Sequence, residues 1–200
     1  MKDRHAVLKK APGFDIPLSA GARSELEVLG LSGLEEVPGK PVHGLDPVEG
    51  RPVVPKQAIC APEVLNEAYD YSTPSSFSRG MRVELPGTTM LFLSGTASVD
   101  ENGDTVHPGD LTAQCLRTFR NLAGLLAVES ASWHDVVRTT CYLRDIERDY
   151  GEFNRIRTLF MRALRLDPLP ASTGIQARLC RADLMVEIEA IAMIPHSTRK

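Results

Sequence analysis

Prolines and glycines divide this chain into an irregular first third and a regular remainder. Residues 1–70 hold 8 of the 14 prolines and 7 of the 15 glycines, although they make up only 70 of the 200 residues. Proline has a fixed φ and no N–H, so a stretch in which Pro or Gly recurs every few positions excludes central strands and long helices. We therefore predict a Pro/Gly-rich N-terminal extension over residues 1–70 and a regular domain over residues 71–200.

Two short helices are expected inside the extension. The first is AGARSELEVL, residues 20–29. The second is expected to start at Pro62, because proline in a first helical turn loses no hydrogen bond.

Strand and helix patterns alternate beyond residue 71. Helices are predicted from the N-cap Asp110 to about Glu129 and over residues 147–164, each with one apolar stripe. Strands are predicted over residues 82–84, 90–94, 136–143, 172–179 and 184–194. Asn102-Gly103 indicates a tight turn. The order β-β-α-β-α-β-β predicts an α+β fold in which two helices cover one face of a sheet, so the other face needs burial, for instance by oligomerisation.

The last predicted strand places two carboxylates on one face. Under period 2, Glu187 and Glu189 share a face with Met185, Ile191 and Met193, at a spacing of about 7 Å. Burial raises the pKa of a carboxyl group, which suits acid–base catalysis. A pair of structural or interface salt bridges is the alternative.

Composition excludes several classes of protein. The hydrophobic fraction is 42% and the formal charge is −3, which excludes collagen-like and disordered chains and does not favour a nucleic-acid partner. We find neither an apolar run of membrane-spanning length nor an apolar leader, so no membrane association and no secretion are expected. The four cysteines form no C-x-x-C pair, which predicts free thiols, a cytoplasmic location and no metal site.

Several motifs occur together in the regular domain: SGTASVDENGDTV, a helix with Gln114 and Asn121, VVRTTCYLRD, Phe153-Asn154, PLPAST and VEIEAIA. In this combination the domain resembles the RidA/YjgF family, also called the reactive-intermediate deaminase or L-PSP family. It implies a chorismate-mutase-like fold and a homotrimer whose sheets line a central barrel, with clefts between subunits. It also implies hydrolysis of small imines or enamines, a small-molecule metabolite as partner and no cofactor.

The resemblance carries over to this chain residue by residue. Glu187 matches the carboxylate that positions the hydrolytic water, which makes it the catalytic candidate. Ser172 stands where typical members have a carboxylate-binding Arg, and Phe77 stands where they have a Tyr. Substrate contacts are also expected from Thr173, Gly174, Ser94 and Asn154.

Two arginines are candidates to replace the missing one. Arg79 follows Phe77 closely, and Arg178 is expected on the strand of Ser172, on the same face. Each has an ordinary surface or interface arginine as its alternative. Tyr142 is a further candidate for the cleft lining, with a core aromatic residue as its alternative.

Three functions remain open at this point. The first is a RidA-like hydrolase of an imine, an enamine or a related enol-type metabolite. The second is a RidA-like protein that binds a small metabolite without turnover, which the missing Arg and Tyr favour. The third is chorismatase-like hydrolysis of an enol ether, since ARLCRADLMVEIEAI partly resembles the C-terminal half of chorismatases. Endoribonuclease activity, a label often attached to the family, is disfavoured by the charge.

Overall fold

The computed structural model describes residues 19–28, 50–72 and 74–196, and contacts divide the chain into the units Met1–Val53 and Val54–Lys200. In the first unit, the predicted helix forms as α2 (Ala20–Val28). Its start is capped by Ser19, whose hydroxyl accepts a hydrogen bond from the Ala22 N–H at 3.1 Å.

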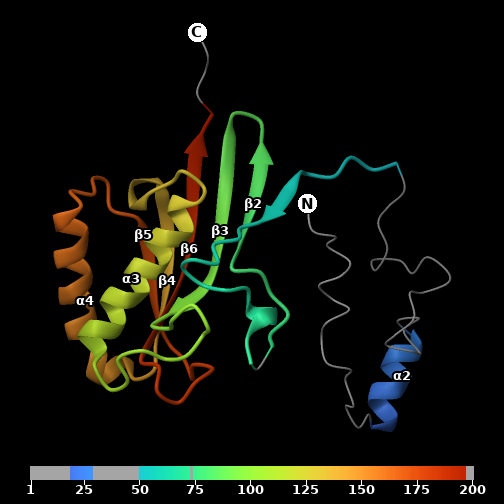
Figure 1. The fold of residues 1–200 in the computed structure, drawn as a ribbon, viewed down its shortest axis with the longest axis horizontal. Helices are drawn as coiled ribbons and strands as arrows, with labels where there is room; N and C mark the ends of the chain where they lie inside the picture. Colours follow the sequence, from blue (N-terminus) through green and yellow to red (C-terminus); the bar gives the residue numbers. More distant parts are fainter. Residues whose placement is uncertain (1–18, 29–49, 73, 197–200) are drawn as a thin grey trace. The chain divides into compact units, whose positions relative to one another are not determined.

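The second unit is built on one six-stranded sheet with the order β1-β2-β3-β6-β4-β5 (Figure 1). The pair β4–β5 is parallel and the other pairs are antiparallel, so the sheet is mixed. The strands are β1 (Lys56–Ala58), β2 (Gly80–Leu85), β3 (Thr88–Ala97), β4 (Val136–Leu143), β5 (Ala171–Gln176) and β6 (Val186–Pro195). Two short 3₁₀ helices, η1 (Ala68–Asp70) and η2 (Trp133–Asp135), lie in the connections.

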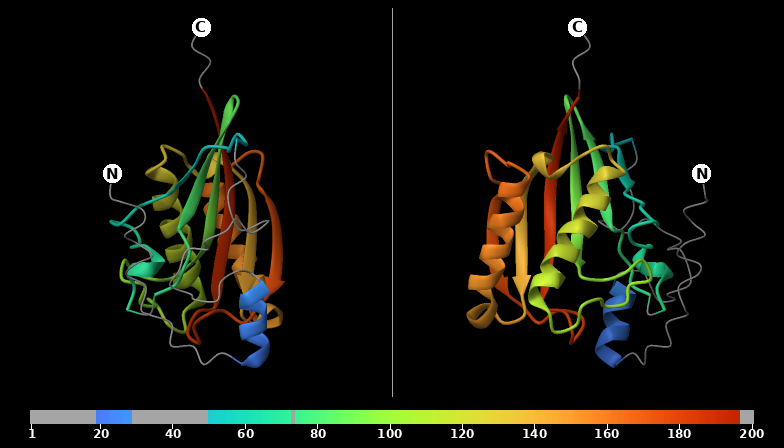
Figure 2. Two further views of the ribbon diagram at one scale, coloured as in Figure 1. Left: turned by 90° about the vertical axis from the view of Figure 1, so that its right-hand side faces the viewer. Right: turned by 60° about the vertical axis from the view of Figure 1, so that its left-hand side comes forward.

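Two helices, α3 (Leu111–Ala127) and α4 (Ile146–Ala163), cover one face of this sheet (Figure 2). Each begins at an aspartate whose side chain accepts a backbone N–H of the first turn, Asp110 for α3 and Asp145 for α4. Helix α3 packs on β3 and β6, and α4 packs on α3 and β4. On the covered face of β6, Val186, Ile188 and Ala190 are at most 3% exposed. The predicted α+β class, with a mixed sheet covered by two helices on one face, is confirmed.

The other face of the sheet is apolar and open. Strand register places Met81, Phe92 and Ile191 side by side on this face, next to Val83, Met90 and Met193. Phe92 is 40% exposed, Ile175 41% and Met193 38%. Large apolar side chains at this exposure are typical of an interaction surface.

The segment before β2 differs from the prediction. No α-helix starts at Pro62: residues 62–64 form a turn closed by a bridge between Ala61 and Leu65, and only η1 is helical. The turn is held by tertiary packing, because Val64 lies so close to Gly124 of α3 that a Cβ there would meet it at 2.6 Å. Strand β1 pairs with β2, so the residues from 54 onward pack with the sheet domain although their prolines suggested an extension.

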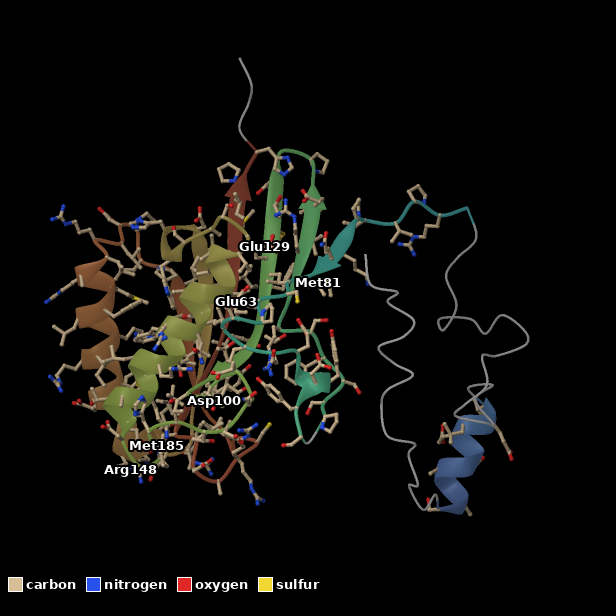
Figure 3. All side chains as sticks on the ribbon, viewed as in Figure 1. Glu63, Met81, Asp100, Glu129, Arg148 and Met185 are labelled. Atoms are coloured by element: carbon tan, nitrogen blue, oxygen red, sulfur yellow. The ribbon has the colours of Figure 1, made fainter. Side chains whose placement is uncertain are left out.

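Two buried polar side chains, Gln114 and Asn121, and the half-buried Arg144 fix the loops at one end of the sheet. Gln114, 0% exposed, donates to the carbonyl oxygens of His107 and Asp183 and accepts the Met185 N–H. Asn121 donates to the carbonyl oxygens of Ala97 and Val99, at the end of β3. Arg144 donates to those of Arg181 and Leu184. The loop into β6 and the end of β3 are therefore both tied to the helix layer. Met185 lies in the loop into β6 and Asp100 in the turn that follows β3, and both are labelled in Figure 3.

Within the described ranges, we find no helix that combines the length and the apolar character needed to cross a membrane.

We expect Gln114→Ala to lower the free energy of unfolding by roughly 2–4 kcal/mol, about 1 kcal/mol for each lost hydrogen bond plus a cavity contribution. Urea denaturation at fixed protein concentration measures this. Arg120→Ala, on the exposed side of the same helix, serves as the control and should change stability by less than about 0.5 kcal/mol. Equal stabilities for the two variants would contradict the assigned role of Gln114.

Candidate active site

A cavity of about 480 Å³ opens at the end of the sheet that Gln114 and Asn121 organise. Its walls come from the segment between η1 and β2, the end of β3 with the following turn, and the loop into β6. Its lining includes the predicted site residues Phe77, Arg79 and Glu187, together with Tyr71, Gly95, Asp104, Cys180 and Arg181. The structure thus brings three of the predicted site residues together within one chain.

Glu187 lies at the start of β6, where β3 makes room for its carboxyl group. A register shift between Leu93 and Thr96 marks a β-bulge opposite β6. Gly95 lies in this bulge, and a Cβ on it would come within 2.0 Å of the Glu187 Oε1. Burial and, to a smaller extent, the charge of Glu189 raise the pKa of Glu187 above its ordinary value. A carboxyl group that holds its proton at higher pH is suited to proton transfer.

Arg79 is buried in the wall of the cavity, 5% exposed. Its Nε donates to the Asn66 carbonyl oxygen at 2.9 Å, and its guanidinium carbon lies 4.6 Å from the Tyr71 ring centroid and 5.2 Å from that of Phe77. The Tyr71 ring packs against Gly103, where a Cβ atom would come within 2.3 Å of the ring. Gly103 has φ +85°, so both its backbone conformation and this close contact favour glycine. The guanidinium therefore makes cation–π contacts with both the Tyr71 and the Phe77 ring.

A second group of predicted residues lies at the opposite edge strand, β5. The Ser172 hydroxyl accepts hydrogen bonds from the Thr139 hydroxyl at 3.0 Å and from Arg157 Nη1 at 2.9 Å. Arg157 Nη2 also donates to the Asn154 Oδ1 at 2.6 Å, so the side chains of Ser172 and Asn154 meet on one guanidinium. Sequence reasoning did not single out Arg157, which stands one helical turn after Asn154.

The β5 group does not meet the cavity within one chain. Strand β4 separates β5 from β6, since Cys141 pairs with both Gly174 and Ile188. Two strand spacings put Gly174 roughly 10 Å from the β6 backbone. Ser172 also faces the helix layer, as its contact with Thr139 shows, whereas Glu187 is on the other face. Thr173, next to Gly174, accepts a hydrogen bond from Arg138 at 3.2 Å.

The three remaining predicted residues are scattered. Ser94 donates to the Ser78 carbonyl oxygen at 2.7 Å and lines a second cavity of about 410 Å³ with Phe77 and Glu189. Tyr142 lies half-buried on the open face, where burial and Glu189 raise its pKa. The prediction for Arg178 is wrong in one respect: β5 ends at Gln176, so Arg178 lies in the following loop and not on the strand of Ser172.

The structure adds Tyr71 and Arg181 to the candidates. Both line the first cavity, and no local sequence signal distinguished them from other residues of their loops. The described residues contain no group of His, Cys, Asp and Glu side chains that could hold a metal ion.

We expect Glu187→Gln to stabilise the protein near neutral pH. Because the pKa of Glu187 is raised above 4.5 on folding, its contribution to stability is complete below that pH and is lost as the pH rises through the raised pKa. The variant, which cannot ionise, should melt at a higher temperature than the wild type near pH 7 and at nearly the same temperature near pH 4. Thermal denaturation over this range measures the difference; a constant difference at all pH values would contradict the raised pKa, and Glu101→Gln, at an exposed position, is the control.

Comparisons with known proteins agree with this architecture. A family model described as Endoribonuclease L-PSP matches residues 72–194. The 3-aminoacrylate deaminase RutC of Acinetobacter baylyi is 30% identical over 105 residues, which are 52% of this chain and 79% of that protein. The 2-iminobutanoate/2-iminopropanoate deaminase of Mus musculus is 28% identical over 103 residues, 52% of this chain and 73% of that protein.

Solved structures show the same fold. The YjgF gene product of E. coli superimposes with a TM-score of 0.54 at 23% identity and covers 68% of this chain and 97% of that one. The match of the family model to more than half of the residues decides the assignment. The chain belongs to the Endoribonuclease L-PSP family, that is, to the RidA/YjgF family.

Proposed function

We propose that this protein hydrolyses a small imine or enamine to the corresponding carbonyl compound and ammonia. One observation carries the proposal: the Glu187 carboxyl group, with its raised pKa, occupies a cavity of about 480 Å³ in a space that Gly95 leaves free. The family membership and the names of the two deaminases support the same reaction class.

The reaction needs one water and two proton movements. Water adds to the carbon of the C=N bond, the nitrogen takes up a proton, and the resulting amino alcohol loses ammonia to leave the C=O bond. An enamine first takes a proton on carbon and then follows the same course. Glu187 suits these steps because a carboxyl group with a raised pKa can hold the water and exchange protons with it. The low polarity that raises its pKa also strengthens its hydrogen bonds.

We further propose that the working cleft lies between subunits of a homotrimer. The open face of the sheet carries exposed apolar side chains that a barrel of three sheets would bury. Ser172, Thr173, Gly174 and Asn154 lie at one edge of the sheet domain and Glu187 lies away from that edge, so the β5 edge of one copy has to meet the cavity of the next for all of them to share a substrate.

Replacing Glu187 by Gln should lower the rate of ammonia release by roughly 100-fold or more, the usual contribution of a general acid–base group. Gly95→Ala should have a similar effect with Glu187 still present, because the new methyl group displaces the carboxyl. A suitable substrate is 2-iminopropanoate, generated in the cuvette from alanine by an amino acid oxidase. Glu101→Gln, at an exposed position, is the control and should keep most of the activity.

The same assay separates turnover from binding alone. Full activity of Glu187→Gln would remove the catalytic role of that residue. Stabilisation of the wild type by a metabolite, with no turnover of imines, would instead support the alternative of a metabolite-binding protein without catalysis.

We expect Phe92→Glu to prevent trimer formation. Phe92 is 40% exposed at the centre of the open sheet face, and three buried carboxylates at one axis would repel each other. Sedimentation velocity should show a trimer for the wild type and a monomer for the variant. Leu159→Glu, at an exposed position on the outer side of α4, should leave the trimer intact. A wild-type monomer at tens of micromolar would contradict the proposed assembly.

A further inference from the structure

A row of thiol and hydroxyl groups leads from the core to the exposed edge strand β5. Thr139 and Cys141 of β4 are 2% and 1% exposed, and the Cys141 Sγ donates to the Thr139 hydroxyl at 3.9 Å. The Thr139 hydroxyl donates in turn to that of Ser172 at 3.0 Å. Ser172 is exposed on β5, the last strand of the sheet, so this row of donors ends at the surface.

Arg157 gives the Ser172 hydroxyl a second donor. Nη1 of Arg157 donates to the Ser172 Oγ at 2.9 Å, while Nη2 donates to the Asn154 Oδ1 at 2.6 Å. The guanidinium carbon lies 5.1 Å from the ring centroid of Phe153, which is fully buried. Arg157 forms none of the ion pairs found among the described residues, so its charge acts on these two polar partners.

The two incoming hydrogen bonds determine what the Ser172 hydroxyl can still do. A serine hydroxyl has two acceptor lone pairs and one hydrogen to donate. Thr139 and Arg157 use both lone pairs, and the hydrogen remains. Within the described part of the chain, the remaining contact of this hydroxyl is the Cys141 Sγ at 3.8 Å, and a thiol is a weak acceptor. The hydroxyl is therefore arranged to donate to an acceptor from outside the chain, and the charge of Arg157 strengthens that donation.

We infer that Ser172 donates a hydrogen bond to the substrate and that Arg157 is the positioning residue that holds and polarises this hydroxyl. The group recognised on the substrate is a hydrogen-bond acceptor such as a carbonyl oxygen. This inference rests on the proposed function, in which the β5 edge of one copy meets the Glu187 cavity of the next. At residue 172, where typical relatives have an arginine, this chain uses a hydroxyl that is itself hydrogen-bonded to a guanidinium from α4.

Direct contact between the Arg157 guanidinium and the substrate is the competing explanation. Arg157 is half-buried and both of its terminal nitrogens already donate within the chain, whereas Ser172 is exposed. The hydroxyl is therefore the more accessible of the two groups. The two explanations differ in one measurable respect: if Arg157 acts through Ser172, removal of the hydroxyl also removes the effect of Arg157 on binding.

A double-mutant cycle measures this dependence. Titration calorimetry with pyruvate, the product of the imine assay described above, follows binding without turnover. Ser172→Ala should weaken pyruvate binding by roughly 5–20-fold, the usual effect of losing one strong hydrogen bond. Arg157→Met should weaken it by roughly 3–10-fold when Ser172 is present, and by less than about twofold in the Ser172→Ala background.

Two further variants separate this role from a structural one. Ser172→Thr keeps a hydroxyl at the same position and should keep most of the binding that Ser172→Ala loses. Arg155→Met removes the same charge from the same helix, but Arg155 is exposed and paired with Glu152, so pyruvate binding should change by less than about twofold. In the imine assay, Arg157→Met should raise KM and leave kcat within about twofold, which a general loss of folded protein would not do.

Any of four outcomes would overturn the inference: no pyruvate binding by the wild type, unchanged binding by Ser172→Ala, an equal effect of Arg157→Met with and without the Ser172 hydroxyl, or an equal effect of Arg155→Met and Arg157→Met. If Arg157→Met does not fold, Arg157→Lys takes its place in the cycle. Lysine keeps the charge but lacks the planar fork that serves Ser172 and Asn154 together, so a smaller loss is expected, again absent in Ser172→Ala. A loss that persists in Ser172→Ala would overturn the inference.

Failure of the proposed function would look different. A wild type that binds pyruvate through Ser172 but hydrolyses no imine would refute the hydrolase and leave the hydroxyl donor standing. An active enzyme whose KM and pyruvate affinity are both unchanged in Ser172→Ala would do the reverse.

Discussion

The fold and the site both depend on the buried amide of Gln114. It bonds to the loop before α3 and to the segment that leads into β6, and it is fully satisfied because these backbone groups converge on it. Asn121, two turns further along α3, does the same for the end of β3. Helix α3 lines no part of the first cavity, yet it sets the position of two of the three segments that do. A polar core of this kind tolerates little rearrangement, since each displaced loop would leave a buried group without a partner.

The helices and strands that were predicted correctly are those in which apolar residues recur at regular spacing. The stripes of α3 and α4 and the alternation in β6 gave element positions within a few residues, and the motifs placed Phe77, Arg79 and Glu187 in one site. The segment before β2 has no such periodicity. Its turn at residues 62–64 depends on the absence of a side chain at Gly124, far away in sequence, and β1 depends on pairing with β2. Arg178 was misplaced because β5 ends where its partner β4 ends, which the sequence of β5 does not encode.

Two guanidinium groups lie beside the predicted site residues, one at the β5 edge and one in the wall of the first cavity. Arg157 donates hydrogen bonds to Ser172 and Asn154 at the β5 edge, while Arg79 contacts the rings of Tyr71 and Phe77 in the cavity wall. Ser172, at the position where typical relatives have an arginine, therefore does not leave that edge without positive charge. In the trimer proposed above, a second copy would bury Phe92 and Met193 of the open apolar face and offer its β5 edge to the cavity.

Gly95 and Glu187 form a coupled pair, because the glutamate occupies the volume that a side chain at residue 95 would fill. Gly95→Ala should therefore lower the free energy of unfolding strongly while residue 187 is glutamate, and only slightly once residue 187 is alanine. The effects of the two substitutions on stability are then not additive. Such dependence restricts the order in which the positions can change during divergence. Once Glu187 has been replaced by a small residue, a side chain at residue 95 can fill the bulge. Glutamate can then return at residue 187 only after residue 95 is glycine again.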